Sequence, residues 1–127
     1  MKKPSVPLDV LFQALGDRTR LRLLNLVALG EVCVCYFVEI LGEPQPKISR
    51  HLAYLRNAGL VSTRRDGKWM HYRLAKLPDP QAAKVVKAVL AALAADAQMQ
   101  RDQRALRAAC CAPKPLIADA PLPALQA

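Results

Sequence analysis

The stretch EVCVCYFVEILGEPQPKISRH, residues 31–51, holds the features that decide the fold. Near its centre, Gly42-Glu43-Pro44 predicts a tight turn. Pro46 then falls in the first turn of the following segment, where its missing N–H costs nothing. Three apolar residues recur at helical spacing and predict the buried stripe of that helix: Ile48, Leu52 and Leu55. A short helix, a glycine-containing turn and a second helix are typical of the helix-turn-helix motif.

Two further helices are predicted upstream of this motif. Residues 6–15 place apolar side chains at helical spacing, and Asp17 is a plausible N-cap for a second helix that extends to about residue 29. Gly30 is well placed to end it. Residues 31–41 then predict an extended segment followed by a brief helix.

Downstream, the sequence predicts a β-hairpin and a long helix. Residues 60–65 and 68–74 are strand-like, and Asp66-Gly67 between them indicates a two-residue hairpin turn, which gives a β-wing. Residues 81 to about 109 predict one long alanine-rich helix with an apolar side. Because such an appended helix needs a partner, the simplest expectation is that it pairs with a second copy of the chain.

The 127 residues suffice for one compact domain. We predict a mostly helical α+β fold, a winged helix-turn-helix with a two-stranded wing and a long C-terminal dimerisation helix. This domain covers residues 1–111, and the proline-rich residues 112–127 form a disordered tail. No apolar run approaches the roughly 20 residues that span a bilayer, and the N-terminus lacks the apolar core of a signal peptide, so a cytoplasmic protein is expected.

Positive charge is concentrated after the predicted turn. The formal net charge is +9, and residues 47–76 hold eight basic residues against one acid, Asp66. Such a concentration attracts a polyanion, and backbone phosphates supply the sequence-independent part of nucleic-acid affinity. Charge alone does not separate this interpretation from a solvated basic surface.

In order and in content, four blocks of the chain resemble the ArsR/SmtB family of metalloregulatory repressors. They are LGDRTRLRLLNLV at 15–27, EVCVC at 31–35, QPKISRHLAYLRNAGLV at 45–61 and RRDGKWMHYRL at 64–74. The resemblance covers roughly residues 11–74. It implies a homodimer that binds double-stranded operator DNA near its own promoter and leaves the DNA when its ion binds.

The polar residues of the recognition helix and of the wing are the predicted DNA contacts. The N-terminal end of such a helix directs side chains at base edges in the major groove, and the wing approaches the neighbouring backbone or minor groove. We assign DNA binding to Gln45, Lys47, Ser49, Arg50, His51, Arg64, Arg65 and Lys68. For His51, packing or hydrogen bonding within the motif is the stronger expectation, since no second histidine or carboxylate stands at matching helical spacing.

Cys33 and Cys35 form the first thiol pair. On a regular helix, residues two apart point roughly 200° away from each other, so both could hold one ion only if this turn were extended or unwound. Binding would then distort the start of the helix-turn-helix. The resemblance identifies this CVC segment as the place where arsenite sensors hold As(III). The lack of a cysteine before Cys33 argues against the related lead and cadmium sensors. Tyr36 and Val38 depart from the common arsenite pattern, which has an acid and a third cysteine there.

Cys110 and Cys111 form a second thiol pair at the end of the long predicted helix. We expect them either to bind an organoarsenical by themselves or to complete a site with the first pair. All four cysteines are therefore candidate ligands for the effector, As(III) or an organoarsenical, and Sb(III) is expected to follow from similar thiol chemistry. A zinc site on this helix is not expected, since its region offers Asp79, Asp96 and Asp102 without a histidine.

Three alternatives stay open at this point. The thiols could form a redox switch on the same DNA-binding fold. They could instead belong to an arsenic-handling or thiol-exchange enzyme, which we do not favour because a CxxC motif, a phosphate-binding glycine-rich loop and a histidine next to the thiols are all missing. The chain could also bind DNA, or another protein, without any effector.

Overall fold

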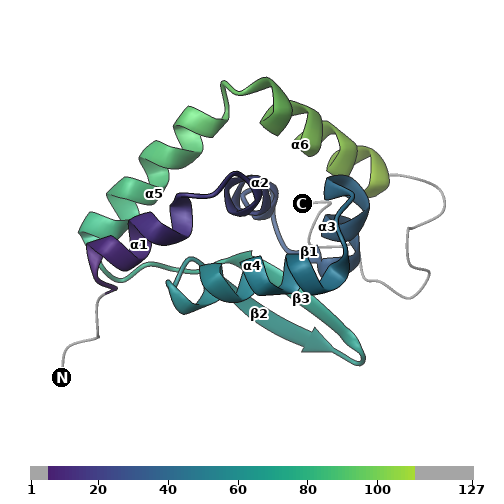
Figure 1. The fold of residues 1–127 in the computed structure, drawn as a ribbon, viewed down its shortest axis with the longest axis horizontal. Helices are drawn as coiled ribbons and strands as arrows, with labels where there is room; N and C mark the ends of the chain where they lie inside the picture. Colours follow the sequence, from purple (N-terminus) through teal and green to yellow (C-terminus); the bar gives the residue numbers. More distant parts are fainter. Residues whose placement is uncertain (1–5, 111–127) are drawn as a thin grey trace.

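The computed structural model describes residues 6–110 of the chain, and both the expected tail and Cys111 lie outside that range. Figure 1 shows the arrangement of the helices and strands. In chain order these are α1 (Leu8–Leu15), α2 (Arg18–Val27), β1 (Val32–Cys33), α3 (Val34–Leu41), α4 (Gln45–Asn57), β2 (Val61–Asp66), β3 (Trp69–Leu74), α5 (Pro80–Leu93) and α6 (Ala97–Cys110). No helix in this range is long and apolar enough to cross a membrane.

The helix-turn-helix of α3 and α4 forms as predicted. Gly42 ends α3 in the left-handed conformation, with φ of 69°, which glycine adopts without strain. Pro44 immediately precedes α4, and Pro46 lies in its first turn. The predicted stripe of Ile48, Leu52 and Leu55 is completely buried. This burial fixes which side of α4 faces the core and so which side faces solvent.

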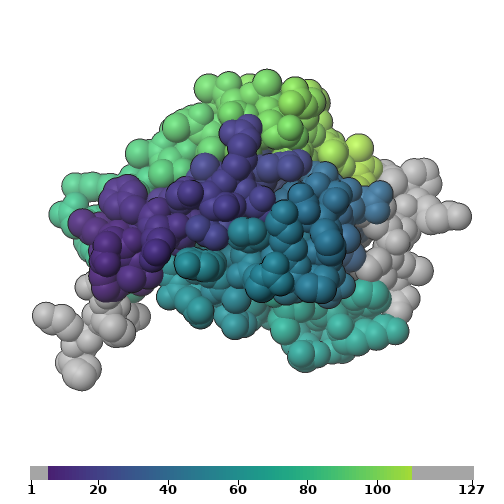
Figure 2. Space-filling view, viewed as in Figure 1, coloured from purple at the N-terminus to yellow at the C-terminus, as the bar shows by residue number. Residues whose placement is uncertain are grey.

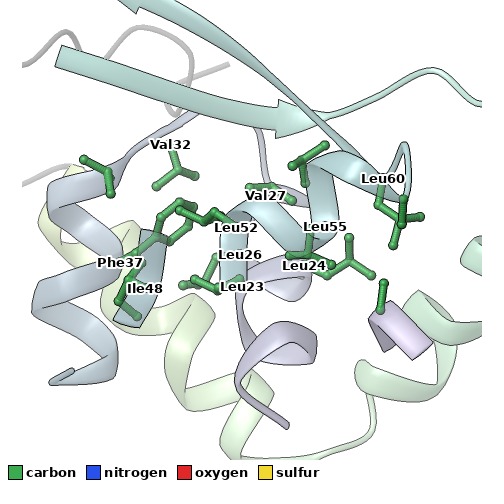
Figure 3. Packing of buried hydrophobic residues seen from close by; sticks show 14 of the residues in the cluster. Leu23, Leu24, Leu26, Val27, Val32, Phe37, Ile48, Leu52, Leu55 and Leu60 are labelled. Atoms are coloured by element: carbon green, nitrogen blue, oxygen red, sulfur yellow. The ribbon is translucent and has the colours of Figure 1, made fainter. Parts of the chain in front are cut away.

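One hydrophobic cluster joins the N-terminal helices, the helix-turn-helix and the sheet (Figure 3). Leu23, Leu24 and Leu26 of α2 lie at its centre with no exposed surface. Asp17 caps α2 as expected, because its carboxylate accepts a hydrogen bond from the backbone N–H of Arg20 at 3.1 Å. Val32 of β1 belongs to the same cluster, so the segment that carries the first thiol pair is anchored in the core.

The sheet has one strand more than the predicted wing. β1 pairs antiparallel with β3 on the side opposite β2, which gives the order β1-β3-β2. The hairpin turn is displaced by one residue, because Asp66 pairs with Trp69 and the loop is Gly67-Lys68. Gly67, the first loop residue, has φ of 64°. Lys68, the second, does not have positive φ, because no non-glycine residue in the described range does. A type II′ turn has this combination.

The prediction of one long C-terminal helix is wrong. The chain turns at residues 94–96 between α5 and α6, and Asp96 caps α6 by accepting hydrogen bonds from the N–H groups of Gln98 and Met99 at 2.9 and 3.2 Å. Both helices lie along the side of the molecule away from the wing (Figures 1 and 2). Val86 is buried in the core cluster of the chain, whereas Val85, Val89 and Leu90 of α5 are only partly buried against it.

Candidate thiol and nucleic-acid site

The thiols of Cys33 and Cys35 lie together where β1 meets α3. Cys33 is the last residue of β1 and the N-cap of α3, with extended backbone angles of −73° and 143°, and Cys35 lies in the first turn of the helix. Their sulfur atoms are 3.2 Å apart. The divergence expected for two helical residues does not arise, because Cys33 precedes the helix. The helix therefore need not unwind before both sulfur atoms can bind one ion.

A hydrogen bond between the two thiols makes them chemically different. The Cys35 S–H donates to the Cys33 sulfur, and this bond lowers the pKa of Cys33 to about 7, although burial acts in the opposite direction. Backbone N–H groups of Cys35 and Val34 add to the lowering. The same thiol–thiol bond, together with burial, raises the pKa of Cys35. Cys33 is therefore the more acidic thiol of the pair, and the thiolate is the form that binds soft ions.

His71 lies next to Cys33 in the sheet. The two residues pair directly across β1 and β3, and His71 is 2% exposed. Its Nε2 atom has no hydrogen-bond partner within residues 6–110. Burial, together with the positive charge of Arg64, lowers the pKa of His71. Within the same range no three His, Cys, Asp or Glu side chains are grouped to hold a metal ion, so the described site offers two sulfur ligands.

The second thiol pair falls at the edge of the described structure. Cys110 is the last residue of α6, and Cys111 lies outside the described residues. The helix itself packs against α3, the helix that contains Cys35. Leu106 of α6 is buried in the common core, and Ala109 packs against it. Cys110 thus ends a helix that packs against the helix containing Cys35.

The predicted DNA-contacting residues of α4 differ in exposure. Gln45 and Arg50 are exposed, whereas Lys47 and Ser49 are half-buried. Lys47 donates a hydrogen bond to the Glu43 carboxylate at 3.1 Å. Because the core stripe fixes the opposite side of α4, the exposed residues at its N-terminal end face solvent, where a DNA groove can approach.

In the wing, the three predicted cations have different surroundings. The Arg64 guanidinium donates two hydrogen bonds to the Glu31 carboxylate, at 2.9 and 2.6 Å. Arg65 and Lys68 are exposed and have no carboxylate partner among the described residues. The Lys68 ammonium lies 5.6 Å from the ring centroid of Trp69. Sequence analysis did not identify Glu31 as part of this surface.

His51 is directed towards α2. Its Nδ1 atom lies 3.2 Å from an Arg20 nitrogen and 3.9 Å from the Asp17 carboxylate. Burial lowers the pKa of His51 and so favours the neutral ring. These contacts favour packing within the motif over a contact with DNA.

Arg20 is a residue that sequence analysis missed. It donates hydrogen bonds to the backbone carbonyls of Ala14 and Gln13 at 2.8 and 2.9 Å, and its guanidinium lies 4.2 Å from the ring centroid of Tyr54. It therefore connects the end of α1 with the recognition helix α4. The signal available in the sequence was its place one turn after the Asp17 cap, but spacing alone did not show its partners.

Apolar side chains on α1 form a surface that was also missed. Leu8, Val10 and Phe12 are 51%, 37% and 54% exposed, although Leu11 and Leu15 of the same helix are buried. Leu8 and Phe12 stand at i and i+4 and share one side of the helix. The sequence signal was present, because α1 is apolar on two sides, but only its helical spacing was used.

Comparison with known proteins agrees with this architecture. Residues 17–63 match the family model described as bacterial regulatory protein, arsR family. The chain is 51% identical over 77 residues to the arsenical resistance operon repressor of Escherichia coli, which covers 60% of this chain and 66% of that protein. It is 54% identical over 69 residues to the arsenic resistance transcriptional regulator ArsR2 of Pseudomonas putida, covering 54% of this chain and 59% of the relative.

The match thus spans less than two thirds of each of these two relatives, 66% of the first and 59% of the second. Among solved structures, the transcriptional repressor BigR from Xylella fastidiosa superimposes with a TM-score of 0.55 at 33% identity, covering 67% of this chain and 84% of that one.

Proposed function

Because the chain belongs to the ArsR family of bacterial transcriptional regulators, we propose that it represses an arsenic-resistance operon and leaves its operator when trivalent arsenic binds its cysteine thiolates. The observation that carries this proposal is the 3.2 Å separation of the Cys33 and Cys35 sulfur atoms. The pair lies at the start of α3, with Cys33 as its N-cap and Cys35 in its first turn, and α3 begins the helix-turn-helix.

Thiol chemistry favours trivalent arsenic at this pair. Each As–S bond forms when a thiol displaces one hydroxyl of arsenous acid, and the thiol proton leaves with that hydroxyl as water. Two thiols thus yield two waters, with no change in oxidation state. Methylarsenite, which has two exchangeable hydroxyls, is fully satisfied by Cys33 and Cys35. The same displacement applies to antimonite.

Inorganic arsenite has a third hydroxyl, and we propose that Cys110 or Cys111 displaces it. The support is that α6, which ends at Cys110, packs against α3. A third sulfur delivered by α6 would link the C-terminal helix to the start of the helix-turn-helix. Cys33, Cys35 and one of the two C-terminal cysteines then form one three-sulfur arsenite site, whereas methylarsenite needs only the first pair.

DNA binding is assigned to the exposed polar end of α4 and to the wing. Gln45, Lys47, Ser49 and Arg50 would enter the major groove, and Arg64, Arg65 and Lys68 would contact the flanking backbone. The protein is proposed to act as a homodimer with two α4 helices on two half-sites. The exposed Leu8 and Phe12 support this assembly, because an apolar stripe on a terminal helix is suited to pairing across a two-fold axis.

The test is release of the reduced protein from promoter DNA, followed by fluorescence anisotropy during titration with arsenite and, separately, with methylarsenite. Both compounds should release the wild-type protein. Cys33→Ser should abolish release by either compound, whereas the double variant Cys110→Ser, Cys111→Ser should retain the response to methylarsenite and lose sensitivity to arsenite. If neither compound releases the wild-type protein, the proposal fails.

The same geometry favours one second candidate, a redox switch. Thiols 3.2 Å apart, one of which has a lowered pKa, can be oxidised by peroxide to a disulfide with release of two waters. Titration of the DNA complex with hydrogen peroxide separates the two functions. Release by peroxide without release by an arsenical would favour the redox function.

A further inference from the structure

Glu31 lies between the thiol pair and the wing and belongs to neither. Its carboxylate accepts hydrogen bonds from Arg64, with Nε at 2.9 Å from one oxygen and Nη2 at 2.6 Å from the other. The Glu31 side chain is 13% exposed, whereas that of Arg64 is 49% exposed. A bidentate pair of this kind fixes the plane of the guanidinium as well as its position. Arg64 keeps Nη1 for another partner.

The backbone connects this ion pair directly to Cys33. Glu31 is two residues before Cys33, and β1 consists of only Val32 and Cys33. Cys33 pairs with His71 on one side of β3, and His71 pairs with Arg64 on the other. Residues that face each other in adjacent strands present their side chains on the same side of the sheet. Cys33, His71 and Arg64 therefore form one row across the three strands, and Glu31 reaches over this row.

A second acidic residue shows why this placement matters. Glu43 also binds a predicted DNA-contacting cation, Lys47, at 3.1 Å. That pair, however, lies four residues apart within the turn and the start of α4, and it has no strand connection to the thiols. Among the ion pairs of the described residues, only the one between Glu31 and Arg64 joins the β1 segment to strand β2 of the wing.

We propose that Glu31 transmits effector binding from Cys33 to the wing. In the free sensor, its ion pair holds Arg64 in the orientation that contacts DNA phosphate. A metalloid bound to Cys33 and Cys35 moves the two-residue strand β1, displaces Glu31 and so withdraws Arg64 from the backbone. This inference rests on the proposed function, because it assigns a route to the release described above. A ligand releases DNA only through contacts that differ between the bound and free states, and this pair supplies one.

The experiment compares Glu31→Gln with the matched control Glu43→Gln in the full chain. The affinity for operator DNA is measured by anisotropy with and without saturating arsenite, and the ratio of the two dissociation constants gives the coupling. Arsenite binding itself is followed separately, as the loss of thiols that react with a disulfide reagent. Glu31→Gln should bind arsenite like the wild type but show a coupling reduced about tenfold, within the usual range of such effects. Glu43→Gln should keep the wild-type ratio.

Arg64→Lys provides a second, independent variant. Lysine keeps the charge that attracts phosphate but cannot form the bidentate pair, so its coupling should fall as in Glu31→Gln. Arg64 is exposed enough for this change to be tolerated by the fold. Wild-type coupling in both variants would overturn the inference while leaving the proposed function intact. Loss of arsenite binding in Glu31→Gln would also overturn it, since Glu31 would then act on the thiols. Failure of arsenite to release the wild-type protein would remove the proposed function and this inference together.

Discussion

Arg18 and Arg22 on α2 differ in their surroundings from Arg50 of α4 and Arg65 of the wing. Arg22 donates to both oxygens of Asp102 on α6, at 2.7 and 2.9 Å, and Arg18 lies 2.9 Å from Asp96. Arg50 and Arg65 are exposed and make no ion pair within the described residues. The first pair of arginines fastens α6 to the body of the protein. The second pair leaves its charge available to a phosphate.

This difference shows why local charge density is a poor guide to function. Both surfaces are rich in arginine, yet carboxylates about 80 residues away in the sequence bind Arg18 and Arg22, whereas Arg50 and Arg65 have no carboxylate partner among the described residues. Asp96 and Asp102, which sequence analysis weighed as metal ligands, are bound to these arginines, and Asp79 accepts a hydrogen bond from the N–H of Gln81 at the start of α5. The contribution of the first surface to stability and that of the second to DNA binding can be tested separately.

The largest effect is expected from Asp102→Asn. Asp102 is 3% exposed, and its neutralisation leaves the largely buried Arg22 guanidinium without a charged partner. The free energy of unfolding, measured with urea, should fall by about 3 kcal/mol. The control is Asp96→Asn, because asparagine is also an effective N-cap for α6. This change removes an ion pair whose arginine is 57% exposed, so the free energy of unfolding should fall by less than about 1 kcal/mol. Equal losses in the two variants would contradict the distinction between them.

A smaller effect, on DNA binding alone, is expected from Arg50→Ala. Loss of a side chain that contacts a base or phosphate should weaken operator binding by about 1–3 kcal/mol, measured by anisotropy at fixed salt. Stability should change little, because Arg50 is exposed. Arg18→Ala serves as the comparison, since its charge is already paired with Asp96. If Arg18→Ala weakened DNA binding as much, the two surfaces would not differ in function.

The smallest effect concerns the two histidines, whose burial disfavours the protonated ring. Burial lowers the pKa of His71, and also that of His51, below the value of the unfolded chain. The unfolded chain therefore binds more protons just below pH 6.5, and the free energy of unfolding falls as the pH is lowered from 7 to 5. One proton contributes at most about 1.4 kcal/mol per pH unit. His71→Gln should show a shallower decrease in urea unfolding over this range. An unchanged slope would show that His71 does not contribute.

Local patterns predicted the DNA-binding half of the fold well. The buried stripe of Ile48, Leu52 and Leu55, the Asp17 cap and the hairpin all depend on interactions between residues close in sequence. The break in the C-terminal helix was missed, because the alanines at 94–95 are strong helix formers. What ends α5 there is the Asp96 cap together with its distant partner Arg18, and no periodicity reports such a contact.

At the thiol site, too, the local features could be predicted and the long-range contacts could not. The cysteines themselves were evident in the sequence, whereas their geometry depended on whether Cys33 belongs to the helix. Pairing with His71, 38 residues further on, keeps Cys33 in the strand, and this long-range contact could not be predicted from spacing. The Glu31–Arg64 pair spans 33 residues and was missed for the same reason.

The brevity of β1 has a consequence for how such a protein can diversify. β2 and β3 pair over six residues each, so the hairpin does not depend on the two residues that β1 adds at its edge. Residues 33 and 35 can therefore be exchanged for other ligand types while the hairpin and α4 keep their shape. Under the proposed function, selectivity for an inducing ion and selectivity for an operator sequence are thus free to evolve separately on one small scaffold.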